Sequence, residues 1–220
     1  MLIITSLGIH SSESPPVSNL LLLGDIMSWY VLFVRNGCED RVKSSLQRLF
    51  SGEMLRCVVP KKQISERRAG QYDLIERLLF PGYVFIQTQM NYSTYYILQK
   101  NPHVYRLLNY CSRKDLIYKH QAMNDLENSE EQYFKQIPEE EISPILGLLD
   151  HDDVAENSRV YFENSRMNVV SGPLTGKEEL VTKVDKRKRR AKVSLQLLGG
   201  GRTIDLGIIL LEPETNLVQE

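Results

Sequence analysis

The sequence predicts an α+β fold in two modules, a mixed α/β module followed by a small β-barrel. Three observations support this prediction. Strand-like and helix-like segments alternate between residues 29 and 110, short β-rich runs follow one another from residue 159 onward, and the charge changes sign in blocks. With 220 residues and 42% hydrophobic content, the chain can bury a core as one large domain or as two small ones.

The formal net charge of -1 conceals the charge blocks. Residues 29–114 contain 14 basic and 6 acidic side chains, whereas residues 125–156 contain 11 acidic side chains and one lysine. Residues 159–212 are basic again, with 11 basic and 6 acidic side chains. Two basic blocks on either side of an acidic block indicate two modules and a connector.

The first predicted strand covers residues 29–34, which are aromatic and β-branched, and Asn36-Gly37 ends it. A helix is predicted over residues 39–50, because Glu39 and Asp40 suit the positive end of a helix dipole. Four apolar side chains then recur at helical spacing: Val42, Leu46, Leu49 and Phe50.

The rest of the first module follows from similar patterns. We expect a strand at 55–60, a basic hairpin-like stretch at 61–77, strands on both sides of a Pro-Gly turn within 78–87, a helix at 92–100 and a strand at 104–110. The resulting order β-α-β-β-α-β is that of a ferredoxin-like sandwich. A further helix is predicted after Pro138, where three glutamates suit a helix start and apolar residues follow on one face.

The second module is predicted from five short β-rich runs. They lie at residues 160–162, 167–170, 180–184, 191–198 and 203–211, with turn-forming residues between them. This pattern is typical of a small β-barrel. We therefore expect a first domain at 27–150, a linker at 151–158 and a second domain at 159–220.

The first 26 residues differ from the rest. They carry no Lys or Arg, and Leu20–Leu23 is too short an apolar run to span a membrane. A signal peptide would begin with a basic region, which is absent. Gly24-Asp25 could be encoded as a ribosome-binding sequence just upstream of Met27. We therefore expect residues 1–26 to be a non-native or disordered extension.

The sequence argues against an enzyme, a metal site and a cofactor. Cys38, Cys57 and Cys111 are far apart and form no C-x-x-C pair, so a disulfide framework or zinc site is not expected and a reducing cytoplasm fits. The four histidines show no metal-ligand spacing and no nucleophile partner. No nucleophile elbow and no phosphate-binding glycine loop is present.

Three segments, in this order, resemble the NusG family of bacterial transcription elongation factors. The run W-Y-V-L-F-V-R-N-G from Trp29 is similar to the start of the family's N-terminal (NGN) domain, and L-F-P-G-Y-V-F-I from Leu79 resembles that domain's most distinctive segment. The run V-S-G-P-L from Val170, followed by V-D at Val184 and A-K-V-S at Ala191, resembles a KOW motif in an SH3-like barrel.

The resemblance implies a function without enzymatic activity. Its NGN domain would bind the clamp helices of the largest RNA polymerase subunit and favour uninterrupted elongation. Its KOW domain would recruit a termination factor, a ribosomal protein or RNA. We expect a cytoplasmic monomer without membrane contact. The polymerase-binding positions implied by the resemblance are Trp29, Tyr30, Phe80, Pro81, Gly82 and Tyr83, although core packing would also explain some of these residues.

Two basic segments are candidates for nucleic-acid contact. In the first module, Lys61, Lys62, Arg67 and Arg68, with Arg77, form either a solvated face or a contact with DNA or RNA, such as upstream DNA at the transcription bubble. In the second module, the run K-V-D-K-R-K-R-R-A-K-V at residues 183–193 carries seven basic side chains. They are Lys183, Lys186, Arg187, Lys188, Arg189, Arg190 and Lys192.

This second run would form the tip and flanks of one β-hairpin in a KOW barrel. Five consecutive cations repel one another, and arginine is well shaped for phosphate and guanine contacts, so a bulged or looped RNA hairpin is the favoured partner. A solvated tip and an acidic protein partner are the alternatives.

The KOW-like segment departs from the family at two positions. The family's usual glycine falls at Glu179 and its aromatic residue at Leu174. These departures, with the basic run, most resemble the LoaP group of paralogs, which promote processive antitermination of long biosynthetic operons. The alternative is a general elongation factor whose KOW domain binds a termination factor or ribosomal protein. A ribosomal KOW protein would explain the barrel but not the F-P-G-Y segment.

Overall fold

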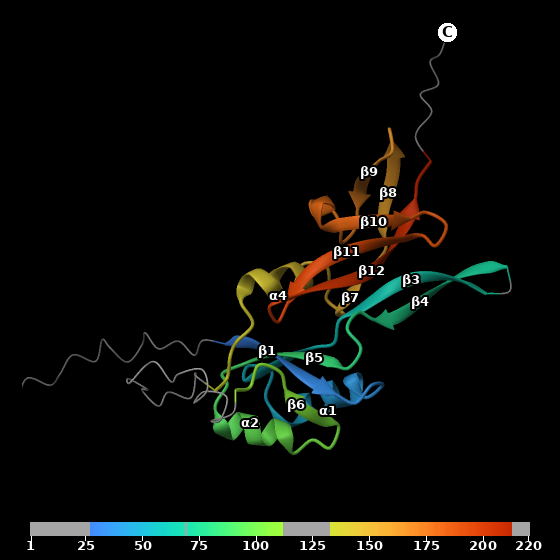
Figure 1. Ribbon diagram of the computed structural model, residues 1–220. Coiled ribbons are helices and arrows are strands. Elements are labelled where there is room, and N and C mark those ends of the chain that lie inside the picture. Colours follow the sequence, from blue (N-terminus) through green and yellow to red (C-terminus); the bar gives the residue numbers. More distant parts are fainter. Residues whose placement is uncertain (1–26, 69, 112–132, 213–220) are drawn as a thin grey trace, which may run out of the picture.

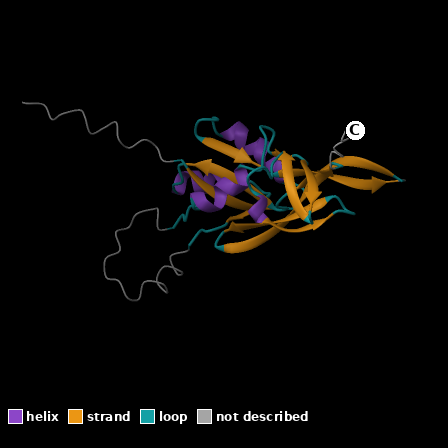
Figure 2. Cartoon of the chain, turned by 90° about the horizontal axis from the view of Figure 1, so that it is seen from above, coloured by secondary structure: helices purple, strands orange, loops and turns teal. Residues whose placement is uncertain are grey.

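The computed structural model describes residues 27–68, 70–111 and 133–212, and for Arg68 and Tyr72 only the backbone (Figure 1). The extension expected at residues 1–26 lies outside this part of the chain. The described residues form a mixed α/β module and a β-rich module, which lie against each other (Figures 1 and 2). The predicted mixed α/β content and the β-rich C-terminal region are confirmed.

The N-terminal module is built on a four-stranded sheet of order β2-β5-β1-β6. Its strands are β1 (Ser28–Val34), β2 (Leu55–Val58), β5 (Tyr83–Thr88) and β6 (Val104–Leu107). Helix α1 (Glu39–Leu49) follows β1, and helix α2 (Tyr92–Gln99) follows β5. Strand β1 lies inside the sheet, antiparallel to both β5 and β6. The expected order β-α-β-β-α-β is therefore present, with one hairpin inserted before β5.

Both faces of this sheet are covered. Alternation along β1 sends Tyr30, Leu32 and Val34 into a core with residues of α1 and α2. Trp29 and Val31 point to the opposite face, where they pack with helix α4 (Glu139–Leu146) and with the C-terminal module. Ile142 and Ile145 of α4 are fully buried in this second core. The sheet therefore serves two cores at once.

The inserted hairpin consists of β3 (Lys61–Arg68) and β4 (Gln71–Leu78), which extend away from the sheet (Figure 1). Gly70 lies at its turn with φ of +90°, a conformation that favours glycine. A short strand, β7 (Val154–Ala155), pairs in parallel with Lys61 and Lys62 of β3. The segment expected to be a linker thus forms part of a three-stranded sheet of order β4-β3-β7.

The C-terminal module is a five-stranded sheet of order β10-β11-β12-β8-β9. Its elements are β8 (Ser158–Glu163), β9 (Arg166–Ser171), the 3-10 helix η3 (Glu178–Leu180), β10 (Val181–Asp185), β11 (Arg190–Leu197) and β12 (Gly200–Leu210). All five runs expected to be strands are strands. In β11 the buried residues alternate with exposed Lys192 and Gln196, so one face of the strand builds the core.

The two modules share one hydrophobic core, which contains Trp29 and Phe85 of the first module and Leu195 and Ile208 of the second. A methyl group at Gly207 in β12 would lie 2.6 Å from the carbonyl oxygen of Gln63 in β3. Only glycine allows β12 to approach β3 this closely. The two modules are therefore in close backbone contact at this point of their junction.

Candidate functional site

The Phe80–Tyr83 turn is held in place by helix α1. Gly82 has a φ of +82°, and its N–H donates a hydrogen bond of 2.7 Å to Oε1 of Glu39, which is 2% exposed. The Gly82 carbonyl accepts a 2.8 Å hydrogen bond from the N–H of Val34. A Cβ at Gly82 would lie 3.0 Å from Oδ1 of Asn36. The turn therefore needs glycine, and Glu39 fixes its position.

The structure separates the six residues proposed to contact polymerase. Tyr30 is buried in the core beneath α1 and α2, whereas Trp29 and Phe80 are buried on the opposite face of the sheet. Among the other three, Pro81 is exposed, Gly82 is buried and Tyr83 is half-buried. Of the six, only Pro81 and Tyr83 offer substantial surface in this arrangement.

An aromatic patch, formed by Phe33, Tyr83 and Tyr105, lies beside this turn. The ring centroid of Phe33 is 6.2 Å from that of Tyr83 and 5.6 Å from that of Tyr105. Tyr105 is 57% exposed, and the guanidinium group of Arg106 lies 6.0 Å from the Phe33 ring. Sequence reasoning missed Phe33 and Tyr105. Their alternation in β1 and β6 was the available signal, but alternation alone does not reveal which side chains meet across strands.

The β3–β4 hairpin carries the first basic segment. Arg67 is exposed. The Nζ atom of Lys61 lies 3.1 Å from Oδ1 of Asp40, and the Nη2 atom of Arg77 lies 3.5 Å from Oε2 of Glu66. Lys62 is half-buried. Burial is the largest cause that lowers its pKa; Asp205 opposes this effect. The remaining candidate of this segment, Arg68, is described only by its backbone.

The second basic segment surrounds the turn between β10 and β11. The Asp185 carboxylate accepts a 2.9 Å hydrogen bond from the N–H of Lys188, and Arg189 adopts a left-handed φ of +52°. Three tip residues, Lys186, Arg187 and Lys188, are exposed. A side chain of the run itself therefore orders this turn.

The cations of this run, at the tip and on its flanks, have different surroundings. Lys183 is exposed, and exposed Lys192 lies 3.4 Å from Oδ1 of Asp205. Arg189 and Arg190 are half-buried. Lys186 places its ammonium group 3.6 Å from the centroid of the Phe162 ring, a cation–π contact. The exposed tip and the half-buried flank therefore present different donors.

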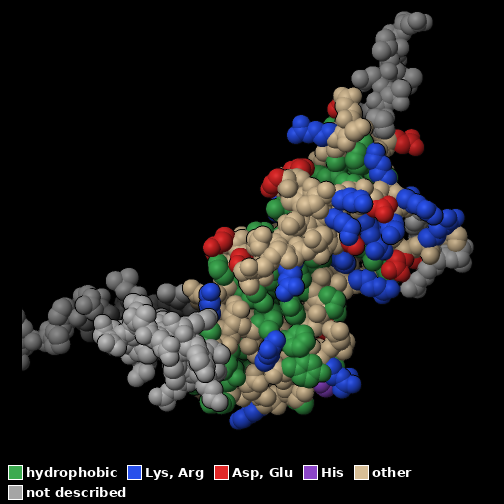
Figure 3. All heavy atoms as spheres, viewed as in Figure 1, with side chains coloured by type: hydrophobic (Ala, Val, Ile, Leu, Met, Phe, Trp, Pro, Cys, Tyr) green, Lys and Arg blue, Asp and Glu red, His purple; other side chains and the backbone are tan. Residues whose placement is uncertain are grey.

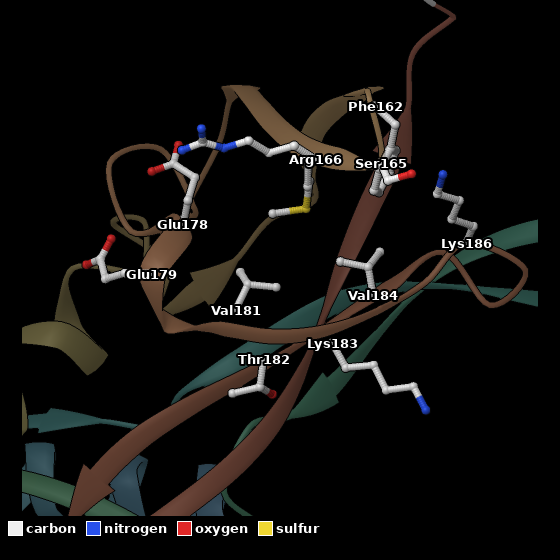
Figure 4. Close-up of a pocket in the computed structure, with 11 residues that line it drawn as sticks. Phe162, Ser165, Arg166, Glu178, Glu179, Val181, Thr182, Lys183, Val184 and Lys186 are labelled. Carbon is white, nitrogen blue, oxygen red and sulfur yellow. The ribbon is translucent and has the colours of Figure 1, made fainter.

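An open groove of about 830 Å³ lies next to this tip, between the β8–β9 hairpin and β10 (Figure 4). Phe162, Met167, Val181 and Val184 are among its lining residues. The pairing of β10 with β11 shifts register between Val181 and Lys183, which breaks strict alternation along β10. The lining combines these apolar side chains with cations such as Lys186 and with the carboxylates of Glu178 and Glu179.

The structure brings the two basic segments to the same face. Figure 3 shows lysine and arginine side chains gathered over the region where the two hairpins approach each other, with fewer acidic side chains among them. A guanidinium nitrogen of Arg190 in β11 lies 3.9 Å from Oε1 of Glu66 in β3. Segments that are far apart in the sequence are therefore neighbours.

Two kinds of site are absent from the part of the chain that the structure describes. Within residues 27–68, 70–111 and 133–212, no group of His, Cys, Asp and Glu side chains is arranged to hold a metal ion. Nor does any helix in these ranges have the length and apolar character needed to cross a membrane.

Comparison with known proteins gives consistent matches. Residues 27–145 match a family model described as "Transcription termination factor nusG". The chain is 29% identical over 188 residues to the transcription termination/antitermination protein NusG of Vibrio parahaemolyticus, covering 81% of this chain and 91% of the relative. It is 27% identical over 190 residues to NusG of Escherichia coli K12, covering 84% and 94%.

Similar solved structures were also found. A structure described as "Domain interaction in Thermotoga maritima NusG" is 21% identical, with a TM-score of 0.46, and the match covers 82% of this chain and 93% of that one.

Proposed function

Because the chain belongs to the NusG family of transcription termination/antitermination factors, which are not enzymes, we propose that it binds RNA polymerase and promotes processive antitermination of a target operon. The N-terminal module acts as the NGN domain and contacts the clamp helices of the largest polymerase subunit. The C-terminal module acts as a KOW barrel and binds a structured RNA element in the leader of that operon. The exposed basic tip at Lys186–Lys188 is the observation that carries this proposal.

The polymerase contact is assigned to the aromatic patch and the adjoining turn. Aromatic side chains bury a large area at low entropic cost and commonly dominate interface energies. Pro81 and Tyr105 are exposed, and Tyr83 is half-buried. Trp29 and Phe80 are buried and are therefore not assigned to the contact in this arrangement.

The RNA contact is assigned to the tip between β10 and β11. Three exposed cations in sequence repel one another in the free protein, and phosphate groups would relieve that repulsion. The hydrogen bond from the Lys188 N–H to Asp185 orders the turn before binding, which lowers the entropic cost of recognition. A narrow, ordered tip suits the widened groove beside an RNA bulge better than a regular duplex.

Assignment to the antiterminator group is supported by the loop before η3. Leu174, where the family usually has an aromatic residue, is fully buried, and its N–H donates a 3.0 Å hydrogen bond to Oγ of Ser158. The loop therefore presents no aromatic side chain at position 174 to a protein partner. This loss favours a specialised LoaP-like factor over a general one.

The test is a titration of the full chain with the leader RNA of the operon beside its gene, and with an unrelated stem-loop of equal length. The double variant Arg187→Ala/Lys188→Ala should weaken binding to the leader at least about tenfold, and each lost phosphate contact should lower the salt slope by about 1. Arg202→Ala, an exposed cation in β12, is the matched control. Equal binding of both RNAs would contradict specific leader recognition.

A general elongation factor is the second candidate, and the groove at Phe162 favours it. A groove lined by apolar side chains and by charges of both signs also fits a protein segment. In that case a purified termination factor or ribosomal protein would bind the full chain, and Phe162→Ala would abolish this binding while the leader RNA would show no specific affinity.

A further inference from the structure

We propose that the basic hairpins of the two modules act as one surface, which holds a single folded RNA across the module boundary. This inference rests on the proposed RNA-binding function and extends it to the N-terminal module. We call this surface the composite basic face. It consists of Lys62 and Arg77, which pair across the β3–β4 hairpin on the same side as Glu66, and of Lys186–Arg190 and Lys192 from the β10–β11 hairpin.

The first argument is that the hairpins are held in a fixed relation. Strand β7, which leads into the C-terminal module, pairs with β3 at Lys61 and Lys62. Strand β12 packs on β3 at Gly207, where a Cβ would meet the carbonyl oxygen of Gln63 at 2.6 Å. Because β11 pairs with β12 along its whole length, the basic tip is positioned relative to β3. A rigid arrangement allows two modules to contact one ligand without an added entropic cost.

The second argument is that the two modules share their acidic residues at the seam. The carboxylate oxygens of Glu66 lie 3.5 Å from Nη2 of Arg77 in its own hairpin and 3.9 Å from Nη2 of Arg190 in the other module. Asp205 lies 3.4 Å from Lys192. Glu66 therefore serves cations from both modules, Asp205 also acts electrostatically on Lys62, and the tip residues Lys186–Lys188 are exposed. The face therefore has an excess of positive charge that spans the boundary.

The third argument is that cations at the seam lack full compensation. Burial lowers the pKa of Lys62, Asp205 opposes this effect, and Arg190 and Lys192 add to it. The Nε atom of Arg190 is buried and has no hydrogen-bond partner among the described residues. Phosphate groups bound near this seam would supply the missing negative charge.

A folded RNA fits this face better than an acidic protein or a single strand. Phosphates of a folded stem recur at regular spacing and present a broad, stiff surface, so they can reach cations on both hairpins at once. The protruding tip would enter a bulge, while Arg77 and Lys62 would contact the adjoining backbone. A single strand or a short acidic peptide would contact one hairpin alone.

The test measures binding of the full chain to a fluorescently labelled RNA stem-loop with one internal bulge, by anisotropy across a salt series. Arg77→Ala in the N-terminal hairpin and Arg187→Ala in the C-terminal hairpin should each weaken binding several-fold and lower the salt slope by about 1. Lys100→Ala, an exposed cation at the end of α2, should leave binding unchanged.

Gly207→Ala provides a variant that removes no charge. Its methyl group should displace β12 from β3, weaken RNA binding and abolish the additional effect of Arg77→Ala. Circular dichroism and thermal unfolding would establish that this variant is folded; if it is not, the Arg77→Ala and Arg187→Ala pair decides.

The outcomes separate this inference from the proposed function. If Arg187→Ala weakens binding and Arg77→Ala does not, the composite basic face is wrong and RNA binding by the C-terminal module stands. If neither variant changes binding, both are wrong. Equal affinity for a DNA hairpin of the same sequence would overturn the preference for RNA. Displacement of the RNA by polyglutamate at equal charge would identify an acidic-protein site instead.

Discussion

The ammonium group of Lys43 in α1 lies 2.7 Å from the carboxylate of Asp153, in the segment that leads to the C-terminal module. The same carboxylate accepts a 3.3 Å hydrogen bond from the N–H of Val59, and the Asp153 carbonyl accepts a 2.8 Å bond from the N–H of Lys61. Asp153 also has a left-handed φ of +64°. One residue therefore ties a helix, a strand and the connecting segment together.

Asp153→Ala should destabilise the protein by about 2 kcal/mol, because it removes a partly buried ion pair and places alanine at an unfavourable φ. Asp153→Asn is the matched control, since asparagine tolerates a left-handed φ and keeps an acceptor for Val59, so it should lose about half as much. Urea unfolding monitored by circular dichroism measures both. Equal losses of unfolding free energy in the two variants would show that the ion pair with Lys43, not the left-handed backbone of residue 153, accounts for the effect.

Glu39→Ala should loosen the turn that precedes β5. The Gly82 N–H would lose its buried acceptor, at a cost of about 1–3 kcal/mol. Glu39→Gln keeps an amide oxygen at the same place and should restore most of the lost stability. Thermal unfolding of the two variants provides the comparison, and a Glu39→Ala variant as stable as the original protein would contradict this role.

Tyr105→Ala should weaken binding to a clamp-helix fragment of the largest polymerase subunit at least about tenfold, or about 1.4 kcal/mol, if the aromatic patch is the contact surface. Tyr96→Ala is a matched control, because Tyr96 is 62% exposed, against 57% for Tyr105, but lies on helix α2. Isothermal titration calorimetry measures both variants. If only Tyr96→Ala weakened binding, the polymerase contact would lie on helix α2 instead of the aromatic patch.

The sequence predicted the local elements closely, because each follows from short-range patterns. The helix expected over 39–50 is observed as Glu39–Leu49, and the basic run forms a hairpin turn as expected. What could not be predicted depends on long-range packing. Neither the hydrogen bond from Gly82 to Glu39 nor the approach of Gly207 to β3 leaves a periodic signal. Strand alternation does predict that Trp29 and Tyr30 point to opposite faces of the sheet. The family resemblance nevertheless placed both residues in one polymerase-binding site.

Cys57 should resist alkylation in the native protein. Burial raises the pKa of its thiol to about 12, so almost no thiolate is present at pH 8, whereas Cys111 is only half-buried. Mass spectrometry after iodoacetamide treatment should therefore find Cys111 modified first. Early modification of Cys57 would show that the N-terminal core opens readily.

The difference between the thiol pKa of Cys57 in the folded protein and in the unfolded chain also predicts how stability depends on pH. In the unfolded chain this thiol ionises near pH 9, but in the folded protein only near pH 12, so the folded state retains the proton longer. Stability should fall as pH rises from 9 to 12, with a contribution from Cys57 of up to about 1.4 kcal/mol per pH unit. Cys57→Ala should reduce this slope. An unchanged slope would assign the pH dependence to other groups.

The order of strands in the first sheet also has a consequence for synthesis on the ribosome. Strand β1 is made first, yet its two neighbours, β5 and β6, end at residues 88 and 107, and its Trp29 face is covered by residues between 137 and 208. At about 5–20 residues per second, the nascent chain carries β1 for several seconds before its sheet can close. The segment at the start of the family resemblance therefore leaves the ribosome well before the residues that enclose it.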